Sequence, residues 1–449
     1  MFKKLFAPVD MTVGSPWKDI ILFTLPMLIG NIAQQLYNTV DTIVVGRYVG
    51  DNALAAVGSA GPIVNLILVL FIGISTGTGI MVSQYFGARD REGLSYTIGN
   101  CITVTLIACA FMMVCITPLI RPLLQLLNTP ETIINDCANY LIISVLGIAG
   151  LGFYNILSGV LRGMGDSFSA LIYLLVATVI NIVLDIYFVA SLGMGVAGVA
   201  LATVIAQFIS ATLCLLKIVR MKDNFEFQVY TLRPKAQYVK TIVRLGLPSG
   251  LTQAIFSSAM IIVQSLTNTF GEQFIAANVV VMRVDGFAMM PNFSFGMAMT
   301  TYAGQNVGAK LYDRVTKGAK QGTWIAVACS ATITGIILLF GKGLMSIFTE
   351  TTDLVDLSYV LMCILAPGYI AMAVTQSLSG IMRGAGDTMT PMWTSLITSV
   401  FLRIPIAYAL APVVGKTCIQ ISLLCTWVMG ALITVVFYCM GRWKNKAIQ

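Results

Sequence analysis

Two aspartates stand inside long apolar segments of the chain, where an ionised side chain is costly. Asp41 lies toward the end of the first such segment, and Asp185 lies well inside the fifth. Placing an ionised side chain in the middle of a membrane costs about 2.5–3.5 kcal/mol on insertion scales, so each aspartate calls for a reason. Tyr37 precedes Asp41 by four residues and Asn181 precedes Asp185 by four, which puts each pair on one helix face.

Such a cluster has the chemistry of a buried cation site. A pair of carboxylates supported by amide, phenol and hydroxyl groups could hold a proton, because removal from water and a like-charged neighbour favour the protonated form. It could equally hold Na⁺, a hard cation that prefers oxygen ligands. The alternative is that each aspartate caps a helix end or bonds a neighbouring backbone group. Gln34 shares the helix face of Tyr37, and both are candidates for substrate contact in a cavity.

The elements that position these residues follow from the composition. Of 449 residues, 57% are apolar and 10% are charged, and the mean hydropathy is +0.87. A soluble domain is about a quarter charged, and a membrane helix needs roughly 20 apolar residues. We therefore predict an all-α membrane protein with twelve transmembrane helices, at 18–44, 53–84, 94–118, 134–158, 168–190, 195–219, 240–267, 274–304, 319–341, 357–379, 389–411 and 418–440.

The basic residues predict how these helices are oriented. With the N-terminus in the cytoplasm, 21 of the 27 Lys and Arg residues fall in cytoplasmic segments and four fall in outer loops. Both termini are therefore expected to be cytoplasmic, in a multi-pass protein of the inner or plasma membrane. The net charge of +8 is explained by the excess of basic residues in these cytoplasmic segments, so no nucleic-acid partner is needed to explain it.

Residue types that carry enzyme or metal chemistry are scarce. The chain has no histidine, and its ten cysteines are scattered without paired CxxC spacing. Imidazole sites, zinc sites and disulfides are therefore not expected. No nucleophile–base constellation stands out. We expect no enzyme activity, no cofactor and no structural metal site.

The chain contains an internal repeat. "LSGVLRGMGD" at 157–166 recurs as "LSGIMRGAGD" at 378–387, and "QYFGAR" from Gln84 recurs as "QNVGAK" from Gln305, both at an offset of 221. Each copy holds six predicted helices, an even number, so the two copies enter the membrane in the same orientation. We predict two pseudo-symmetric six-helix bundles, an N-terminal lobe at 1–220 and a C-terminal lobe at 239–449, joined by a polar linker at 221–238.

The repeat also serves as an internal control for the polar cluster. The second-half counterparts of Asp41 and Asp185 are apolar: Ile262 or Val263, and Ile406 or Ala407. Ion coupling is therefore expected in the N-terminal half.

Three charged residues of the second half have open roles. Arg283 and Asp285 lie near the end of the eighth segment and could bond each other, in a structural or gating role or in contact with substrate. Arg403 lies one residue beyond the counterpart of Asn181, where it could neutralise a site or extend its charge to the membrane surface.

Two further features concern conformation. Arg162 with Asp166, and Arg383 with Asp387, flank glycines in predicted cytoplasmic turns and are interpreted as a latch or turn. Pro26 interrupts the first helix and favours a bend, which would act as a hinge or remain a static kink.

The chain resembles the multidrug and toxic compound extrusion (MATE) family over its full length. The resemblance rests on the doubled "LSGVLRGMGD" and "LSGIMRGAGD", on "PMLIGNIAQQLYNTVDTIVVG" in the first segment, on "GMGVAGVALAT" opening the sixth and on "GQNVGA" closing the eighth. It implies two six-helix lobes around a V-shaped cavity, and export of organic, often cationic, drug-like compounds against H⁺ or Na⁺.

The resemblance also implies particular residues. In the DinF-like branch, the coupling site would consist of Asp41, Asn181, Asp185 and Thr203, and Pro26 would be the point where the first helix bends. The NorM-like branch has a seventh-helix glutamate, where this chain reads "LPSGLTQAIF" without an acid. That departure favours the N-terminal site and leaves Gln253 as a cavity candidate.

We therefore expect a monomeric multidrug efflux antiporter embedded in the lipid bilayer. The nearest alternative is a flippase for a lipid-linked glycan, a related two-lobe protein, against which twelve rather than fourteen spans argue. A membrane-embedded enzyme would need a catalytic constellation that we do not find. A channel is disfavoured because a twofold repeat builds a cleft more readily than a pore.

Overall fold

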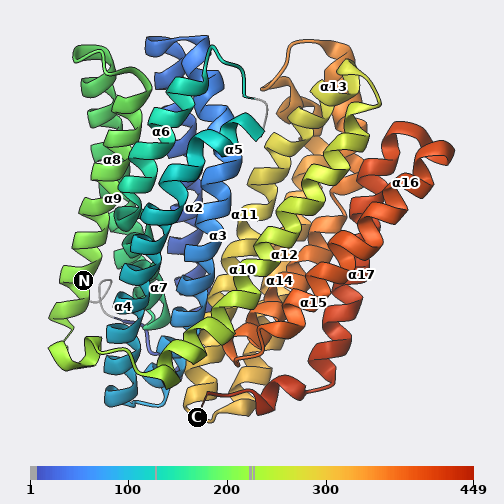
Figure 1. Cartoon of the computed structure of the whole chain (residues 1–449). Coiled ribbons are helices and arrows are strands. Elements are labelled where there is room, and N and C mark those ends of the chain that lie inside the picture. Colours follow the sequence, from blue (N-terminus) through green and yellow to red (C-terminus); the bar gives the residue numbers. More distant parts are fainter. Residues whose placement is uncertain (1–7, 127–128, 222–224, 226–227, 449) are drawn as a thin grey trace. The chain divides into compact units, whose positions relative to one another are not determined.

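A computed structural model describes residues 8–126, 129–221, 225 and 228–448. Within these residues the secondary structure is helical, with no strand. The chain divides into two compact units, each made of two stretches: Met1–Val9 with Ile29–Gly250, and Asp10–Leu28 with Leu251–Gln449. We refer to these as unit 1 and unit 2. The predicted all-α class with two six-helix halves is confirmed (Figure 1).

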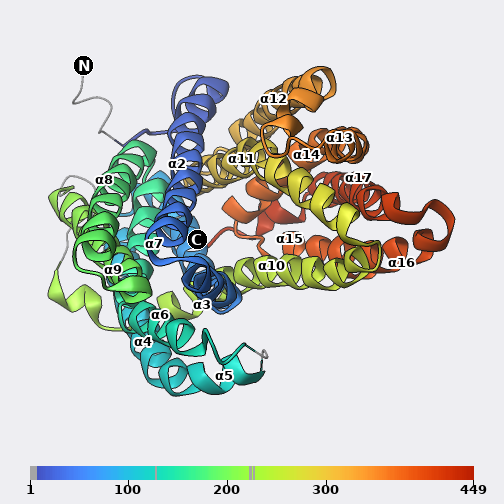
Figure 2. The same cartoon turned by 90° about the horizontal axis from the view of Figure 1, so that it is seen from above.

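The helices of unit 1 run alongside one another and are seen nearly end-on in Figure 2. They comprise the second part of α2 (Pro16–Val44), the first part of α10 (Ala236–Asn268), and α3 (Asp51–Gly87), α4 (Arg91–Ile116), α5 (Ile120–Leu126), α6 (Ile134–Leu146), α7 (Ile148–Gly163), α8 (Ser167–Asp185) and α9 (Gly195–Arg220).

The helices of unit 2 repeat this plan. They comprise the first part of α2, the second part of α10, and α11 (Glu272–Gly308), α12 (Tyr312–Ser346), α13 (Thr352–Leu365), α14 (Gly368–Gly384), α15 (Met389–Leu396), α16 (Arg403–Val414) and α17 (Cys418–Cys439).

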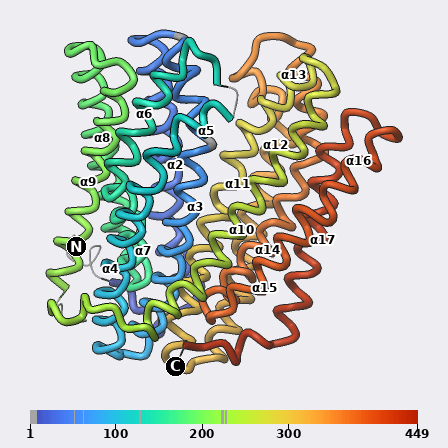
Figure 3. Tube along the Cα trace, in the orientation of Figure 1, coloured from blue at the N-terminus to red at the C-terminus, as the bar shows by residue number. Residues whose placement is uncertain are grey.

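Long apolar helices account for the predicted membrane spans. Among the described residues, nine helical stretches have the length and apolar composition of a span, and two bent helix pairs, α6–α7 at 51° and α13–α14 at 46°, form one each. The last stretch, Met389–Cys439, is 51 residues long, about 77 Å at 1.5 Å per residue and more than twice a hydrocarbon core of about 30 Å. The chain doubles back within it, between α16 and α17 (Figure 3). Counted as two passes, this stretch completes the twelve predicted spans.

Glycines at matching positions bring helices together in both units. A Cβ on Gly159 of α7 would lie 3.1 Å from the carbonyl oxygen of Ser75 on α3, and one on Gly380 of α14 would overlap the carbonyl oxygen of Gly296 on α11. Both the glycines and their partners are 221 residues apart. The sequence repeat is thus also a repeat of helix packing.

The repeated motif ends in a helix cap. Asp166 accepts hydrogen bonds from Ser169 N at 2.9 Å and Ser169 Oγ at 2.7 Å, at the start of α8. Asp387 does the same with Thr390, from N at 3.2 Å and Oγ1 at 2.7 Å. Such caps satisfy backbone donors that have no partner within the helix. The turn before each aspartate contains a glycine in the left-handed region, with φ of 89° at Gly165.

The aspartate of the predicted latch or turn is paired with a lysine. Lys217 Nζ of α9 lies 3.6 Å from Asp166 Oδ2, and no ion pair joins Arg162 to Asp166 in the part of the chain that the structure describes. Burial raises the pKa of Asp166, and the hydrogen bonds from Ser169 and the nearby Lys217 act against that rise. The aspartate therefore acts as a cap, tied to α9 by a lysine.

Two helices change units part-way along their length. Unit 2 takes in residues up to Leu28, two positions after Pro26 in α2, and unit 1 ends at Gly250, two positions after Pro248 in α10. The two prolines are 222 residues apart. Both helices continue through their proline without a break in the helical assignment. The packing units therefore differ from the predicted lobes at α2 and at the first part of α10.

Candidate functional site

Three helices of unit 1 bring the predicted coupling residues together. In the amide orientation that satisfies its neighbours, Asn181 Nδ2 on α8 donates to Asp41 Oδ1 on α2 at 2.8 Å and to Asp185 Oδ2 at 3.2 Å. The other end of that amide lies 3.4 Å from Thr203 Oγ1 on α9. One asparagine thus bridges two carboxyl groups from different helices.

Tyr37 extends the cluster along α2. Its hydroxyl donates to Thr203 Oγ1 at 3.3 Å, and it lies one helical turn before Asp41. Tyr37 and Thr203 therefore connect α2 to α9 within the cluster.

Burial of the cluster is uneven. Asn181 and Asp185 are fully buried, whereas Asp41 and Thr203 are partly exposed. Asp41 and Asp185 share the amide of Asn181, so two carboxyl groups lie close together, and a proton or a cation bound there would reduce the repulsion between them. Asp185 Oδ1 is buried and has no hydrogen-bond partner among the described residues. Leaving a buried carboxylate oxygen without a hydrogen bond costs free energy. Asp185 Oδ1 is therefore available to bind a proton or a cation.

Apolar side chains close one side of the site. A core cluster formed by Val44, Val45, Ala53, Val189, Val196 and Val199 lies beyond the two aspartates, with Tyr140 of α6 packed against it. Tyr140 also interacts electrostatically with both Asp41 and Asp185. Sequence reasoning missed this tyrosine, since a single tyrosine in an apolar segment carries no spacing signal.

Both aspartate-bearing helices widen directly after the site. A π-helical stretch, η1 (Val45–Val49), follows α2, and another, η3 (Ile186–Ser191), follows α8. π-helical turns are rare and occur often at functional sites. They place the two carboxyl groups next to backbone that departs from regular α-helical hydrogen bonding.

Other predicted residues lie apart from this cluster. Gln34 and Gln253 are exposed. Arg283 is also exposed, and no ion pair joins it to Asp285 among the described residues; Asp285 accepts a hydrogen bond from Tyr369 Oη at 2.9 Å. Residues two apart on a helix point in different directions and cannot face each other.

The donor set suits a light cation and not a resident transition metal. Among the described residues no group of three or more His, Cys, Asp and Glu side chains could hold a metal ion. Two carboxylates, an amide oxygen and a hydroxyl are oxygen ligands of the kind that hard cations prefer.

The fold and the site define a polytopic membrane protein of two repeated six-helix halves with a buried polar cluster in one half, an architecture typical of secondary transporters. The sequence profile of the MatE family matches twice, at residues 26–187 and 248–409, again 222 residues apart. The chain belongs to this family, whose members are membrane transporters rather than enzymes.

Relatives and solved structures agree with this assignment. The chain is 30% identical to the probable multidrug resistance protein YpnP of Bacillus subtilis, over 97% of each chain. It is 28% identical to the probable multidrug resistance protein YoeA of the same organism, over 97% of this chain and 96% of the relative. The crystal structure of MATE in the straight conformation has a TM-score of 0.90 and 25% identity, covering 97% of this chain and 98% of that one. The structure of MATE in the bent conformation has a TM-score of 0.92 and 24% identity, covering 98% and 99%.

Proposed function

We propose that the protein is a secondary active exporter that exchanges drug-like organic compounds for H⁺ or Na⁺ bound at the cluster of Asp41, Asn181, Asp185 and Thr203. The observation that carries the proposal is the bridge from Asn181 to both carboxyl groups, at 2.8 and 3.2 Å, between apolar helices. A structural cap would need one aspartate at a helix end. Two aspartates from different helices sharing one amide form instead a site whose charge depends on what it binds.

Either coupling ion fits this arrangement. A proton would neutralise one carboxylate and remove the repulsion between Asp41 and Asp185, which share the amide of Asn181. A sodium ion would take the unpaired Asp185 Oδ1 together with Asp41 and the oxygens of Asn181 and Thr203. In both cases the negative charge of the site falls, which alters how strongly α2 and α8 are held together.

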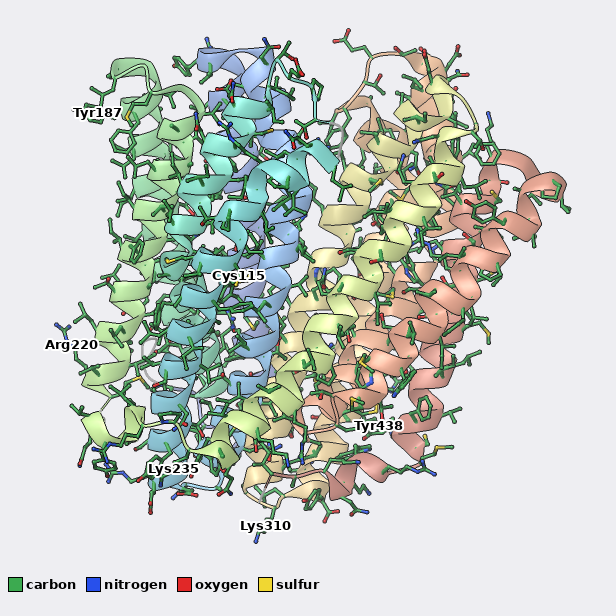
Figure 4. The ribbon with its side chains drawn as sticks, in the orientation of Figure 1. Cys115, Tyr187, Arg220, Lys235, Lys310 and Tyr438 are labelled. Atoms are coloured by element: carbon green, nitrogen blue, oxygen red, sulfur yellow. The ribbon has the colours of Figure 1, made fainter. Side chains whose placement is uncertain are left out.

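We assign the chain to the DinF-like branch on two grounds. The coupling cluster lies in unit 1, and α10 contains no acidic residue in Ala236–Asn268. We further propose a monomer in the inner or plasma membrane with cytoplasmic termini. Within unit 1, Arg220 and Lys235 lie at the end opposite Tyr187 (Figure 4), which agrees with the positive-inside distribution of basic residues.

The deciding experiment is uptake of a fluorescent organic cation into proteoliposomes, with the pH and Na⁺ gradients imposed separately. Uptake driven by one gradient in wild type and lost in Asp185→Asn supports the proposal and identifies the ion. Asp136→Asn is a matched control, because Asp136 is an exposed aspartate of the same unit. Uptake that responds to neither gradient would refute antiport. Transport of a lipid-linked glycan but not of the cation would favour the alternative of a flippase.

A further inference from the structure

Unit 2 contains a pocket whose polar residues have no role in the proposed ion coupling. The pocket is partly open, and its volume is about 570 Å³ when the open solvent at its mouth is counted. Most of the lining is apolar or aromatic, and the polar lining includes Asn278, Asp285, Arg403 and Gln420.

This pocket stands at the position in unit 2 that the coupling site occupies in unit 1. At the offset of 222 between the ends of the two family matches, Asp41 corresponds to Val263 and Asn181 to Arg403. At the offset of 221 between the repeated LSG motifs, each counterpart is the residue before, Ile262 or Leu402. Val263 and Arg403 both line the pocket. The pocket and the cluster of Asp41 and Asn181 therefore lie at equivalent positions of the repeat. In unit 2 an apolar residue stands in place of the aspartate, and a guanidinium stands in place of the neutral amide.

Arg403 is a buried cation whose donors are largely unused. Its side chain is only 4% exposed, so it does not extend its charge to the surface. Nη1 contacts the Met260 sulfur at 3.3 Å, a weak acceptor, and Nε has no partner among the described residues. No ion pair with an acid is present in that part of the chain. An arginine stays protonated in proteins, and Asp285 is the one acidic residue among those that line the pocket. Asp285 can offset the charge of Arg403 but makes no ion pair with it, so the unused donors of the guanidinium remain available to a ligand.

Two other polar groups constrain which ligand these donors can bind. Gln420 Nε2 donates to Asn278 Oδ1 at 2.9 Å, which leaves Gln420 Oε1 buried and without a partner. Asp285 interacts electrostatically with Arg403 but is held by Tyr369 Oη at 2.9 Å. The pocket therefore offers unused donors at Arg403, one unused acceptor at Gln420, and a fixed negative charge nearby.

We propose that this pocket binds small aromatic carboxylates, with the ligand's carboxylate on the Arg403 guanidinium and its ring among Phe256, Leu365 and Trp427. A planar guanidinium matches a carboxylate in shape and charge. A phosphate group would bring more negative charge against Asp285 and needs more donors than one arginine supplies. A neutral aromatic compound without an acceptor would leave the unused donors of Arg403 unpaired. This site is separate from the coupling cluster, and its occupancy does not require that ion coupling is assigned correctly.

The test is calorimetric titration of the full chain in nanodiscs with 1-naphthoate and with its neutral analogue 1-naphthamide, after subtraction of empty nanodiscs. Wild type should bind naphthoate about 10-fold more tightly than naphthamide, the effect of one charge-assisted contact. Arg403→Gln should lose this preference, and Arg403→Lys should keep part of it. Asp285→Asn should tighten naphthoate binding, because it removes the like charge. Arg442→Gln, which changes an exposed arginine of the same unit, should match wild type.

Several outcomes would overturn the proposal. They are absence of naphthoate binding to wild type at millimolar concentrations, equal affinity for naphthoate and naphthamide, and a preference that survives Arg403→Gln. If Arg403→Gln does not fold, the Arg403→Lys and Asp285→Asn variants test the proposal. Naphthoate binding in Asp285→Asn that is unchanged or weaker than in wild type would contradict it. Asp185→Asn should still bind naphthoate like wild type, which separates failure here from failure of the coupling assignment.

Discussion

Replacing Asp185 with asparagine removes an ionisable group from the proposed coupling site with little change in its shape. The new side chain still offers an oxygen to Asn181 Nδ2, whose contact with Asp185 Oδ2 is 3.2 Å, so the link within α8 is kept. A neutral side chain is also cheaper to place in a membrane than an ionised one. Expression and membrane insertion should therefore be preserved while ion binding is lost.

The magnitude follows from the coupling that an antiporter needs. Substrate and driving ion must weaken each other's binding by roughly 1–3 kcal/mol, which is about 5- to 150-fold in affinity. In wild type, the affinity for a fluorescent cation in detergent should fall by such a factor as the coupling ion is added. In Asp185→Asn the affinity should be constant across the same titration, and gradient-driven export should fall to the liposome background.

The assay is fluorescence anisotropy of the substrate, titrated against pH at fixed Na⁺ and against Na⁺ at fixed pH. Asp136→Asn should reproduce the wild-type curves. The reasoning would be refuted by Asp185→Asn protein that keeps the wild-type ion dependence, because the coupling charge would then lie elsewhere.

Three further outcomes are expected. Asp41→Asn should abolish ion-dependent substrate affinity while Gln253→Ala leaves it intact in the same titration, and equal damage by both would mean that the two halves share the coupling. Pro26→Ala should lower the rate of proteoliposome uptake with little change in ion affinity measured in detergent, since a straighter α2 still presents its aspartate; a wild-type rate would remove the hinge role. Gly384→Ala should lower thermal stability by about 1–3 kcal/mol, because its Cβ would meet the backbone of α11, a case of overpacking. Gly335→Ala has open space around the new Cβ and is the matched control in the melting assay.

The fold could be predicted because its signals are strong and redundant. Scarcity of charge required lipid as the solvent, and long apolar windows in lipid leave helices as the spanning form. The offset of 221 located Gly159 and Gly380 at equivalent helix crossings. The division of packing at Pro26 and Pro248 was not predictable, because it depends on which distant helices each half-helix contacts.

Residues of the candidate site could be predicted from the sequence where their spacing lies within one helix. Contacts between residues of separate helices could not be predicted in this way. The four-residue spacing of Asn181 and Asp185 indicated a shared face, and the resemblance to a known family supplied Thr203. Tyr140 was missed because nothing in its own segment indicates what lies opposite. The sequence left two roles open for Arg403, and only its burial in the pocket decided against extension to the surface.

The division of α2 and α10 between the two units has a consequence for how the duplication arose. The first part of α2 is held in unit 2, where Arg314 Nη2 contacts Asp19 at 3.1 Å and Gln305 Oε1 accepts from Met11 N at 2.9 Å. The first part of α10 is held in unit 1, where a Cβ on Gly246 would lie 2.6 Å from the carbonyl oxygen of Gly73. Each half of the gene product therefore completes its bundle with a half-helix from the other. A single ancestral copy with this packing would have been a homodimer exchanging its first half-helices, and fusion of two copies would have turned a mutual exchange between molecules into one within a single chain.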